Sequence, residues 1–278
     1  RSLVGSEMCI RDRGVDVEVV FLTPDSEMSK VQETYPHITF KYMWENLPFS
    51  NRIFNKFADE FYGWKFAWSL KPGDVVFLTN FGNVFFKVVK RKGVKVVHEK
   101  TEHPDVYSFK GFNVERYKRE VVKVDGMFVI STALKDYFVS CGLPKEKIEI
   151  VNMTVDSNRF VGLTKQPSEK YIAYCGTASN NKDGVDELIK SFAIVNKTHP
   201  EVKLYIIGKT PDKNDASGNL KLIENLGVKD SIVFTGIVSA ADIPQILKNA
   251  AVLALDRPDS LQAQCGFPTK LGEYLLTA

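Results

Sequence analysis

Residues 262–278 read QAQCGFPTKLGEYLLTA and follow a short apolar run at 251–255. This pattern predicts a strand, then a tight loop that contains Gly and Pro, and then a helix that begins near Thr269. A helix start presents N–H groups without helical partners and the positive end of the helix dipole, which suits a phosphate. Glu273 lies one turn into this helix, where a carboxylate can accept hydrogen bonds from sugar hydroxyls. The stretch therefore predicts a nucleotide-sugar site, although an ordinary loop–helix junction also fits the pattern.

The rest of the chain alternates short β-branched runs with helical segments, which is typical of parallel sheets built from βαβ units. Strands are predicted at Val15–Leu22, Ile38–Met43, Asp74–Thr79, Val94–His98, Met127–Ile130, Ile148–Val151, Tyr171–Cys175, Leu204–Ile207, Ile232–Phe234 and Ala251–Leu255. Helices are predicted at Asn51–Leu70, Asn83–Lys92, Phe112–Val124, Thr132–Cys141, Gly218–Leu226 and Ala241–Asn249, with a further helical face over Val185–Val195. The expected fold class is α/β, with two Rossmann-like, doubly wound domains facing a cleft, since ligands bind at the carboxyl ends of parallel strands.

Domain boundaries follow from composition. Residues 1–13, RSLVGSEMCIRDR, show no usable periodicity and resemble a translated sequencing adaptor, so we set them aside as non-native. The polar segment Asp156–Glu169 contains Gly and Pro and predicts a linker, which gives domains at 14–158 and 159–278. The chain lacks an initial Met and stops inside an amphipathic helix, so we expect a fragment truncated at both ends, with the first strand and loop missing.

Composition excludes several classes of protein. The 278 residues are 44% hydrophobic and 26% charged with a net charge of +3, which argues against a dedicated nucleic-acid binder. No apolar run approaches the roughly 18 residues of a membrane span. The four cysteines lie far apart without a C-x-x-C spacing, so a disulfide framework or zinc site is not expected and a reducing cytoplasm fits best. The chain also contains no G-x-G-x-x-G after a strand, no P-loop and no Asp-x-Asp pair.

The segment that begins at Gly266 resembles the Glu-x7-Glu signature of glycosyltransferase family 4, also called glycosyl transferases group 1, in a bacterial-type Gly-x-Pro-x-x-x-x-Glu-Tyr variant. Glu273 falls on the second glutamate, which in that family holds the ribose of the donor. Cys265 stands where the first glutamate usually contacts the donor sugar. The resemblance leaves the donor sugar to Gln264 and Cys265, with Gln262 as a further candidate. It assigns phosphate binding to Gly266, Phe267, Pro268, Thr269 and Lys270.

Three upstream segments resemble the same family. Gly176-Thr-Ala-Ser-Asn-Asn-Lys182-Asp-Gly resembles the element that opens the donor domain, in which the lysine holds the diphosphate. From pattern alone, Lys182 is a solvated loop lysine, and a charged contact to phosphate would contribute roughly 1.5–3 kcal/mol. The family often has an arginine where this chain has Thr177. The other two segments, which resemble a donor-domain strand and the turn that receives the base, add the nucleotide-binding candidates Gly208, Phe234 and Gly236.

The first half offers an acceptor-side candidate in His98-Glu-Lys-Thr-Glu-His-Pro104. Its spacing does not favour a metal site, but Glu102 or His103 could orient an acceptor hydroxyl or accept its proton. The stretch Lys87–Lys123 holds eleven basic residues against five acidic ones. A solvated face explains this charge, and the alternative is attraction to anionic lipid, about 1 kcal/mol per basic residue.

The resemblance implies a retaining, metal-independent glycosyltransferase of the GT-B fold and hexosyltransferase type. It would move sugar from a nucleoside-diphosphate sugar to a sugar or lipid-linked acceptor, in cell-surface polysaccharide or glycoconjugate synthesis, without a cofactor and without nucleic acid. Lys182, Glu102 and His103 are the catalytic candidates. The expected location is the cytoplasm, including peripheral contact with the inner membrane face through Lys87–Lys123, and we expect the chain as given to be inactive. Two alternatives stay open, a non-catalytic sugar-nucleotide-binding protein, which Cys265 favours, and a nucleotide-sugar epimerase of similar fold.

Overall fold

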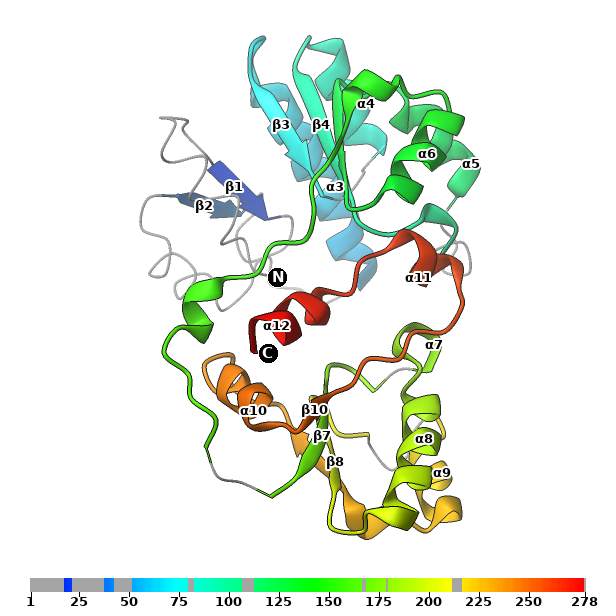
Figure 1. The fold of residues 1–278 in the computed structure, drawn as a ribbon. Helices are drawn as coiled ribbons and strands as arrows, with labels where there is room; N and C mark the ends of the chain where they lie inside the picture. The colour runs from blue at the N-terminus through cyan, green and yellow to red at the C-terminus, as the bar shows by residue number, and fades with distance from the viewer. Residues whose placement is uncertain are drawn as a thin grey trace. The chain divides into compact units, whose positions relative to one another are not determined.

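The strands that pair with one another all run parallel in the part of the chain that the structure describes. This computed structural model describes residues 18–21, 38–42, 52–79, 83–106, 113–166, 169–178, 180–211 and 217–277. The chain divides into two units, Arg1–Val151 and Asn152–Ala278 (Figure 1). The boundary expected after Asn158 lies within the second unit, the expectation for residues 1–13 lies outside the described residues, and the cleft stays a prediction.

The first unit is built on a sheet with the strand order β3-β4-β5-β6. Its strands are β3 (Val75–Leu78), β4 (Lys95–Lys100), β5 (Gly126–Val129) and β6 (Ile148–Ile150). Its helices are α3 (Arg52–Ser69), α4 (Asn83–Arg91), α5 (Val114–Val121), α6 (Thr132–Ser140) and the 3₁₀ turn η2 (Lys145–Lys147). A separate pair, β1 (Glu18–Phe21) and β2 (Thr39–Tyr42), completes the described strands of this unit. Ser131 caps α6 because its hydroxyl accepts the Leu134 N–H at 3.2 Å.

The second unit is built on a sheet with the strand order β10-β7-β8-β9. The strands are β7 (Tyr171–Cys175), β8 (Lys203–Ile207), β9 (Ile232–Gly236) and β10 (Val252–Leu253). The helices are α7 (Asn180–Asp183), α8 (Val185–Thr198), α9 (Asn219–Leu226), α10 (Ile243–Asn249), α11 (Leu261–Cys265) and α12 (Thr269–Thr277), with 3₁₀ turns η3 (Ser157–Phe160) and η4 (Lys229–Ser231). Strand β7 lies between β10 and β8, as a doubly wound sheet requires.

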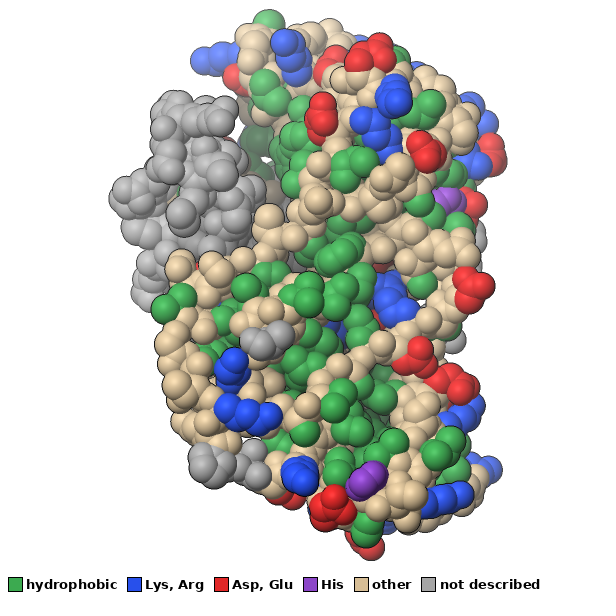
Figure 2. Space-filling model, viewed as in Figure 1, with side chains coloured by type: hydrophobic (Ala, Val, Ile, Leu, Met, Phe, Trp, Pro, Cys, Tyr) green, Lys and Arg blue, Asp and Glu red, His purple; other side chains and the backbone are tan. Residues whose placement is uncertain are grey.

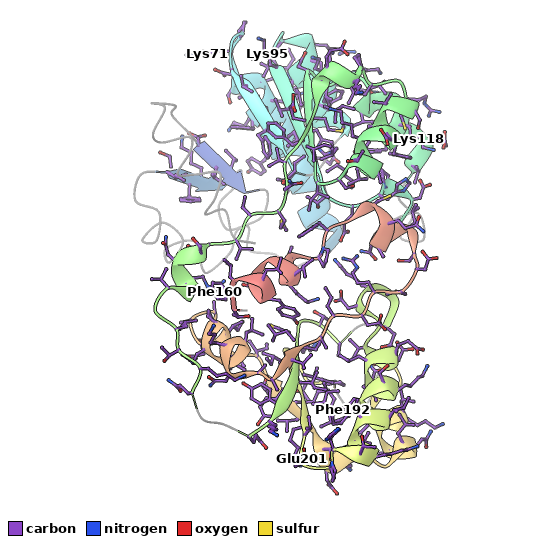
Figure 3. All side chains as sticks on the ribbon, viewed as in Figure 1. Lys71, Lys95, Lys118, Phe160, Phe192 and Glu201 are labelled. Atoms are coloured by element: carbon purple, nitrogen blue, oxygen red, sulfur yellow. The ribbon has the colours of Figure 1, made fainter. Side chains whose placement is uncertain are left out.

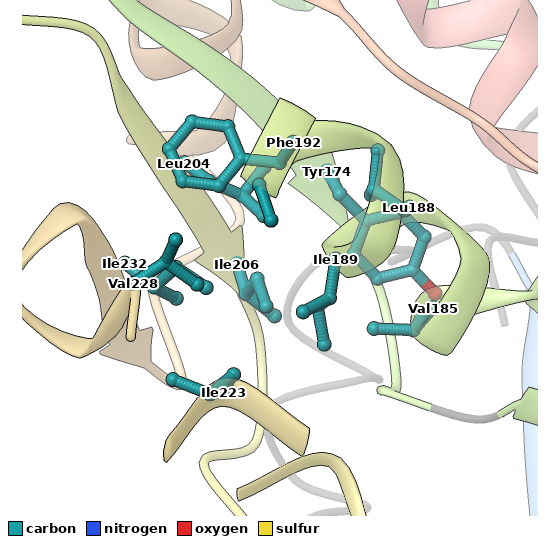
Figure 4. Packing of buried hydrophobic residues seen from close by; sticks show 11 residues of the cluster. Tyr174, Val185, Leu188, Ile189, Phe192, Leu204, Ile206, Ile223, Val228 and Ile232 are labelled. Atoms are coloured by element: carbon teal, nitrogen blue, oxygen red, sulfur yellow. The ribbon is translucent and has the colours of Figure 1, made fainter. Parts of the chain in front are cut away.

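Both faces of this second sheet are covered by helices. Tyr174 of β7 belongs to a buried cluster with side chains of α8 and α9, among them Ile189, Phe192 and Ile223 (Figure 4). Ala173, the residue before Tyr174, belongs to a different cluster formed with α10 and α12. Neighbouring residues of β7 thus bury opposite faces, and each fully buried large side chain contributes roughly 1.5–3 kcal/mol. With both faces covered, a ligand can reach this sheet only at its ends or edges.

Three predicted loops contain helical turns. The segment before Thr269 contains α11, which Ser260 caps by accepting the Ala263 N–H at 3.2 Å. The loop after β7 contains α7, and the predicted linker contains η3. These short helices lack the periodicity of a longer amphipathic helix, so hydrophobic spacing does not indicate them.

Candidate functional site

Three glycines lie at the carboxyl end of the second sheet: Gly176 follows β7, Gly208 follows β8 and Gly236 ends β9. The Gly176 N–H donates to Ile207 O at 2.8 Å, and the Gly208 N–H donates to Gly236 O at 3.1 Å. A Cβ on Gly208 would lie 2.3 Å from Gly176 O, and the φ of Gly208 is +147°. Backbone is in contact with backbone at Gly208, so no side chain fits at this position.

Helix α12 places a lysine over the first of these glycines. Lys270 Nζ lies 2.6 Å from Asp183 Oδ2, and the two side chains are 18% and 5% exposed. A Cβ on Gly176 would lie 2.1 Å from Lys270 Cε. Gly176 therefore provides the space through which Lys270 reaches the buried carboxylate. The pair brings the start of α12 and the end of α7 to the same sheet end.

Tyr174 completes this cluster from within β7. Its hydroxyl lies 2.9 Å from Asp183 Oδ2 and 2.7 Å from Thr177 O, and its single proton can go to one of these acceptors. Burial, followed by the nearby Asp183 carboxylate, raises the pKa of Tyr174 well above its usual value. The hydroxyl therefore stays protonated. Lys270 Nζ also lies 5.1 Å from the centre of the Tyr174 ring, within the range of a cation–π contact.

Lys182, the predicted diphosphate lysine, is the residue before Asp183 on α7 and is exposed. Its neighbour in sequence is thus the carboxylate that binds Lys270. Of the predicted site residues, the structure brings Gly176, Lys182 and Lys270 to one end of the second sheet. Whether Lys182 meets a diphosphate stays a prediction.

Glu273, the predicted ribose acceptor, forms an ion pair one turn further along α12. Arg159 Nη1 donates to Glu273 Oε1 at 2.8 Å, and the side chains are 30% and 23% exposed. Beside it, the Tyr274 hydroxyl accepts the Cys175 N–H at 2.9 Å, which ties α12 to the end of β7. Burial, and then the nearby Glu273 carboxylate, raise the pKa of the Cys175 thiol.

In the segment before α12, one of the two predicted sugar contacts is exposed and the other is buried. Gln264 is exposed, and its amide donates to Asp259 Oδ1 at 2.8 Å. Cys265 is buried, and burial raises the pKa of its thiol. Gly266 closes α11 by donating its N–H to Gln262 O at 3.0 Å. Phe267 and Thr269 are exposed and Pro268 is half-buried, and the Pro268 carbonyl accepts the Leu271 N–H at 3.0 Å.

At the end of β9 the chain passes from the buried core, at Phe234, to an exposed turn after Gly236. Phe234, a predicted nucleotide contact, packs against the buried cluster under α8 and α9. Gly236 has a φ of +72°, and the next residue, Ile237, is 85% exposed. The turn after β9 thus offers backbone groups and an exposed apolar side chain.

In the first unit, the predicted acceptor residues follow β4. His103 is buried, its ring centre lies 4.1 Å from that of Tyr137, and its Nδ1 accepts the Asp105 N–H at 3.3 Å. Burial lowers the pKa of His103. Glu102 is half-buried. His98 within β4 is also buried, between Leu78 O at 2.7 Å and the Tyr117 hydroxyl at 3.0 Å, and burial lowers its pKa to about 4.

The basic stretch Lys87–Lys123 carries several local ion pairs. Lys90 pairs with Asp125, Lys118 with Glu115, and Lys123 with Glu120. On the face drawn in Figure 2, Lys and Arg side chains lie among Asp and Glu side chains over the first unit. None of the described helices is long and apolar enough to cross a membrane. Within the same residues, no group of three or more His, Cys, Asp or Glu side chains could hold a metal ion.

Sequence reasoning missed three residues of this site, namely Asp183, Tyr174 and Arg159. Asp183 and Tyr174 lie within or beside predicted motif residues, and a charged residue next to a buried strand is a weak signal of a buried pair. Arg159 lies in the predicted linker, where no local pattern distinguishes it from a solvated residue.

Comparison with known families matches residues 156–274 to the family described as Glycosyl transferases group 1. The chain is 26% identical over 141 residues to mannosylfructose-phosphate synthase of Agrobacterium fabrum, a match that covers 45% of this chain and 30% of that protein. The matched part thus spans about a third of this relative.

Solved structures of similar shape include HepE of Anabaena in complex with UDP and glucose. The TM-score is 0.69 at 18% identity, over 99% of this chain and 76% of that one. The apo form of the lipopolysaccharide outer core galactosyltransferase WaaB has a TM-score of 0.59 at 17% identity, over 99% of this chain and 75% of that one. These likenesses confirm the predicted α/β, GT-B fold class. The family match covers residues 156–274, most of the second unit.

Proposed function

We propose that this protein is a retaining, family 4 glycosyltransferase that moves a sugar from a nucleoside-diphosphate sugar to an acceptor hydroxyl. The observation that carries the proposal is the arrangement at the carboxyl end of the second sheet, where Lys270 crosses Gly176 at the start of α12. A helix start, a row of glycine backbones and two lysines form an arrangement suited to a diphosphate. The matches to a sugar-phosphate synthase and to a protein in complex with UDP and glucose support this ligand class.

The diphosphate is the leaving group of the proposed reaction. The acceptor oxygen forms a bond to C1 of the donor sugar and loses its proton, while the bond from C1 to the diphosphate breaks and its electron pair leaves with the phosphate. Lys182, the Lys270 side chain and the N–H groups of Thr269 and Lys270 stabilise the negative charge that develops. Fixed donors at a developing charge are commonly the largest contribution to such a rate.

The nucleoside is proposed to lie along the glycine row. Glu273 accepts hydrogen bonds from the ribose hydroxyls, and the base lies at the turn after β9, where Gly236 offers backbone groups and Ile237 offers apolar surface. Gly208 keeps this edge free of side chains. Phe234 does not contact the nucleoside in this proposal but supports the site, because it packs the end of β9 onto the core.

The acceptor is proposed to bind the first unit near Glu102 and His103. A buried imidazole with a lowered pKa is neutral at pH 7, and since His103 Nδ1 accepts the Asp105 N–H, its Nε2–H can orient a hydroxyl by donating to it. The carboxylate of Glu102 can accept the hydroxyl proton. A lipid-linked acceptor would suit the basic stretch Lys87–Lys123 at the cytoplasmic face of the membrane, in polysaccharide or glycoconjugate synthesis.

A second candidate is a sugar-nucleotide-binding protein without catalysis. It is favoured by Cys265, a buried thiol at the position of the family's first glutamate. Burial raises the pKa of this thiol, so the position carries no charge toward the donor sugar. Gln264 would then be the main polar contact to the sugar.

Calorimetric titration with UDP, GDP and ADP, with the corresponding nucleosides, and then with the glucose conjugates of the diphosphates, tests both candidates. We expect one diphosphate to bind at least about tenfold more tightly than its nucleoside, because charged contacts are the strong ones. EDTA should leave this affinity unchanged. Release of the diphosphate in the presence of acceptor hydroxyls would identify the transferase, and tight binding without release would identify the non-catalytic protein. Equal affinity for diphosphate and nucleoside would contradict both.

A further inference from the structure

Arg159 links two segments of the second unit through one planar guanidinium. Nη1 donates to Glu273 Oε1 at 2.8 Å, and Nη2 donates to Ala240 O at 2.6 Å. Ala240 lies in the loop between β9 and α10, a short distance along the chain from the Gly236 turn. Because the guanidinium nitrogens have a fixed geometry, the two bonds set the carboxylate of α12 relative to the loop that follows β9.

The segment that carries Arg159 is itself held in place. Asp156 Oδ1 accepts the Asn158 N–H at 3.0 Å, which starts η3, and Phe160 at its end is buried (Figure 3). The Arg159 guanidinium lies 5.7 Å from the centre of the Phe160 ring. A few residues earlier, Val155 packs so closely on α12 that a Cβ on Gly272 would lie 2.5 Å from its Cγ2. The position of Arg159 therefore follows from packing and not only from its charge.

The contact with Arg159 orients the Glu273 carboxylate so that it could bind the two neighbouring hydroxyls of a ribose. A carboxylate has two oxygens, each of which can accept more than one hydrogen bond. Arg159 binds Oε1, which fixes the orientation of the carboxylate, and the proposed ribose hydroxyls would donate to Oε2. An Arg–carboxylate pair at 30% and 23% exposure contributes little to stability by itself, because water screens both charges.

We propose that Arg159 is a positioning residue for the donor ribose: it holds Glu273 so that the carboxylate accepts the ribose hydroxyls, and it aligns that carboxylate with the loop after β9. The inference rests on the proposed function, in which Glu273 contacts the ribose. It adds a residue from the segment that enters the second unit, and it makes discrimination between ribose and 2′-deoxyribose depend on Arg159.

The test measures the affinities of the best-binding diphosphate among UDP, GDP and ADP and of its 2′-deoxy form. In the unaltered protein we expect the ribose form to bind about tenfold or more tightly, because the lost hydroxyl donates to a charged acceptor. Arg159→Met keeps a long apolar side chain over Phe160 and removes the guanidinium. It should weaken the ribose form about tenfold and the 2′-deoxy form much less, and Arg159→Lys should recover part of the loss.

Two controls separate positioning from general damage. Lys165→Met removes another cation of the same segment, whose Nζ donates to Ala250 O at 3.1 Å, and should leave both affinities unchanged. In a Glu273→Gln background, Arg159→Met should add no further loss of discrimination, since the residue acts through Glu273.

The outcomes distinguish this inference from the proposed function. If Glu273→Gln leaves the ribose preference intact, or none of the three diphosphates binds, the proposed role of Glu273 fails and the inference fails with it. If Glu273→Gln abolishes the preference but Arg159→Met does not, only the inference is overturned. Equal weakening of both nucleotide forms, or tighter binding in Arg159→Met, also overturns it, because the first indicates a structural role and the second indicates competition with the ribose.

Discussion

Within and just after β4 in the first unit, burial keeps two imidazoles neutral, whereas beyond the carboxyl end of β7 in the second unit charged side chains form ion pairs. His98 and His103 both have pKa values lowered by burial. Lys270 and Asp183, by contrast, are both ionisable, nearly buried and 2.6 Å apart. A neutral imidazole can form hydrogen bonds with hydroxyls, and a lysine can attract an anion. Two sheets of the same parallel architecture thus differ in the side chains placed near their strand ends.

The largest effect should come from breaking the buried pair. Asp183→Ala would leave the Lys270 ammonium nearly buried without its carboxylate, and we expect a loss of about 3 kcal/mol in the free energy of unfolding of the second unit. Urea unfolding followed by circular dichroism measures this loss. Tryptophan fluorescence reports the first unit separately, because Trp44, Trp64 and Trp68 all lie there.

The matched control for this prediction is Glu187→Ala, which removes a carboxylate 2.5 Å from Lys190 in an exposed pair of α8. Its cost should stay below about 1 kcal/mol. A loss for Asp183→Ala as small as that of Glu187→Ala would show that the second unit does not depend on its buried charges.

Removing the partly exposed Arg159–Glu273 pair should affect ligand binding more than stability. Glu273→Ala should weaken binding of the nucleoside diphosphate by about 2 kcal/mol, because hydrogen bonds from hydroxyls to a carboxylate are lost. The unfolding midpoint should change less than in Asp183→Ala, since Arg159 remains 30% exposed to water. An unchanged dissociation constant, measured by calorimetry, would remove Glu273 from the nucleotide site.

Lowering the pH should destabilise the first unit, because the buried His98 is neutral in the folded protein. The folded pKa of His98 is about 4, below the ordinary 6.5 of the unfolded chain, so its stabilisation is complete above pH 6.5 and is lost as the pH falls from about 6.5 toward about 4. Between pH 7 and pH 5 we expect a loss of about 2 kcal/mol, measured by tryptophan fluorescence in urea. His98→Gln should flatten this dependence, and replacement of the exposed His199 by Gln should not. A pH-independent midpoint in the unaltered protein would show that His98 is charged in the fold.

The smallest effect should come from the exposed lysine of α7. Lys182→Ala should weaken diphosphate binding about tenfold, while binding of the bare nucleoside and the stability stay nearly unchanged, because only the phosphates lose a contact. Lys197→Ala, a change at an exposed lysine of α8, should alter neither affinity. If diphosphate and nucleoside weaken equally, or neither weakens, Lys182 does not contact phosphate, and Lys270 becomes the main cation of the site.

The parallel strands were predictable because a buried strand between helices leaves a short apolar run, as in Tyr171–Cys175, whose predicted and observed bounds agree. The pairing of charged side chains was not predictable from the sequence. Lys270 and Asp183 are 87 residues apart in the chain, and Arg159 and Glu273 are 114 apart. No local pattern encodes such contacts, since the packing of α12 on the sheet brings them together. The sequence indicated Lys270 and Glu273 as residues that could bind a nucleotide sugar. The fold showed that Asp183 and Arg159 are their ion-pair partners.

The contact of Val155 with Gly272 has a practical consequence for producing the second unit by itself. A polypeptide that began at Arg159, as the composition of the linker suggests, would lack Val155 and leave one side of α12 uncovered. Asp156, which caps η3, would be lost with it. A start before Asn152, the first residue of the second unit, retains both. The residues that join the two units in the chain thus belong, by their packing, to the second unit.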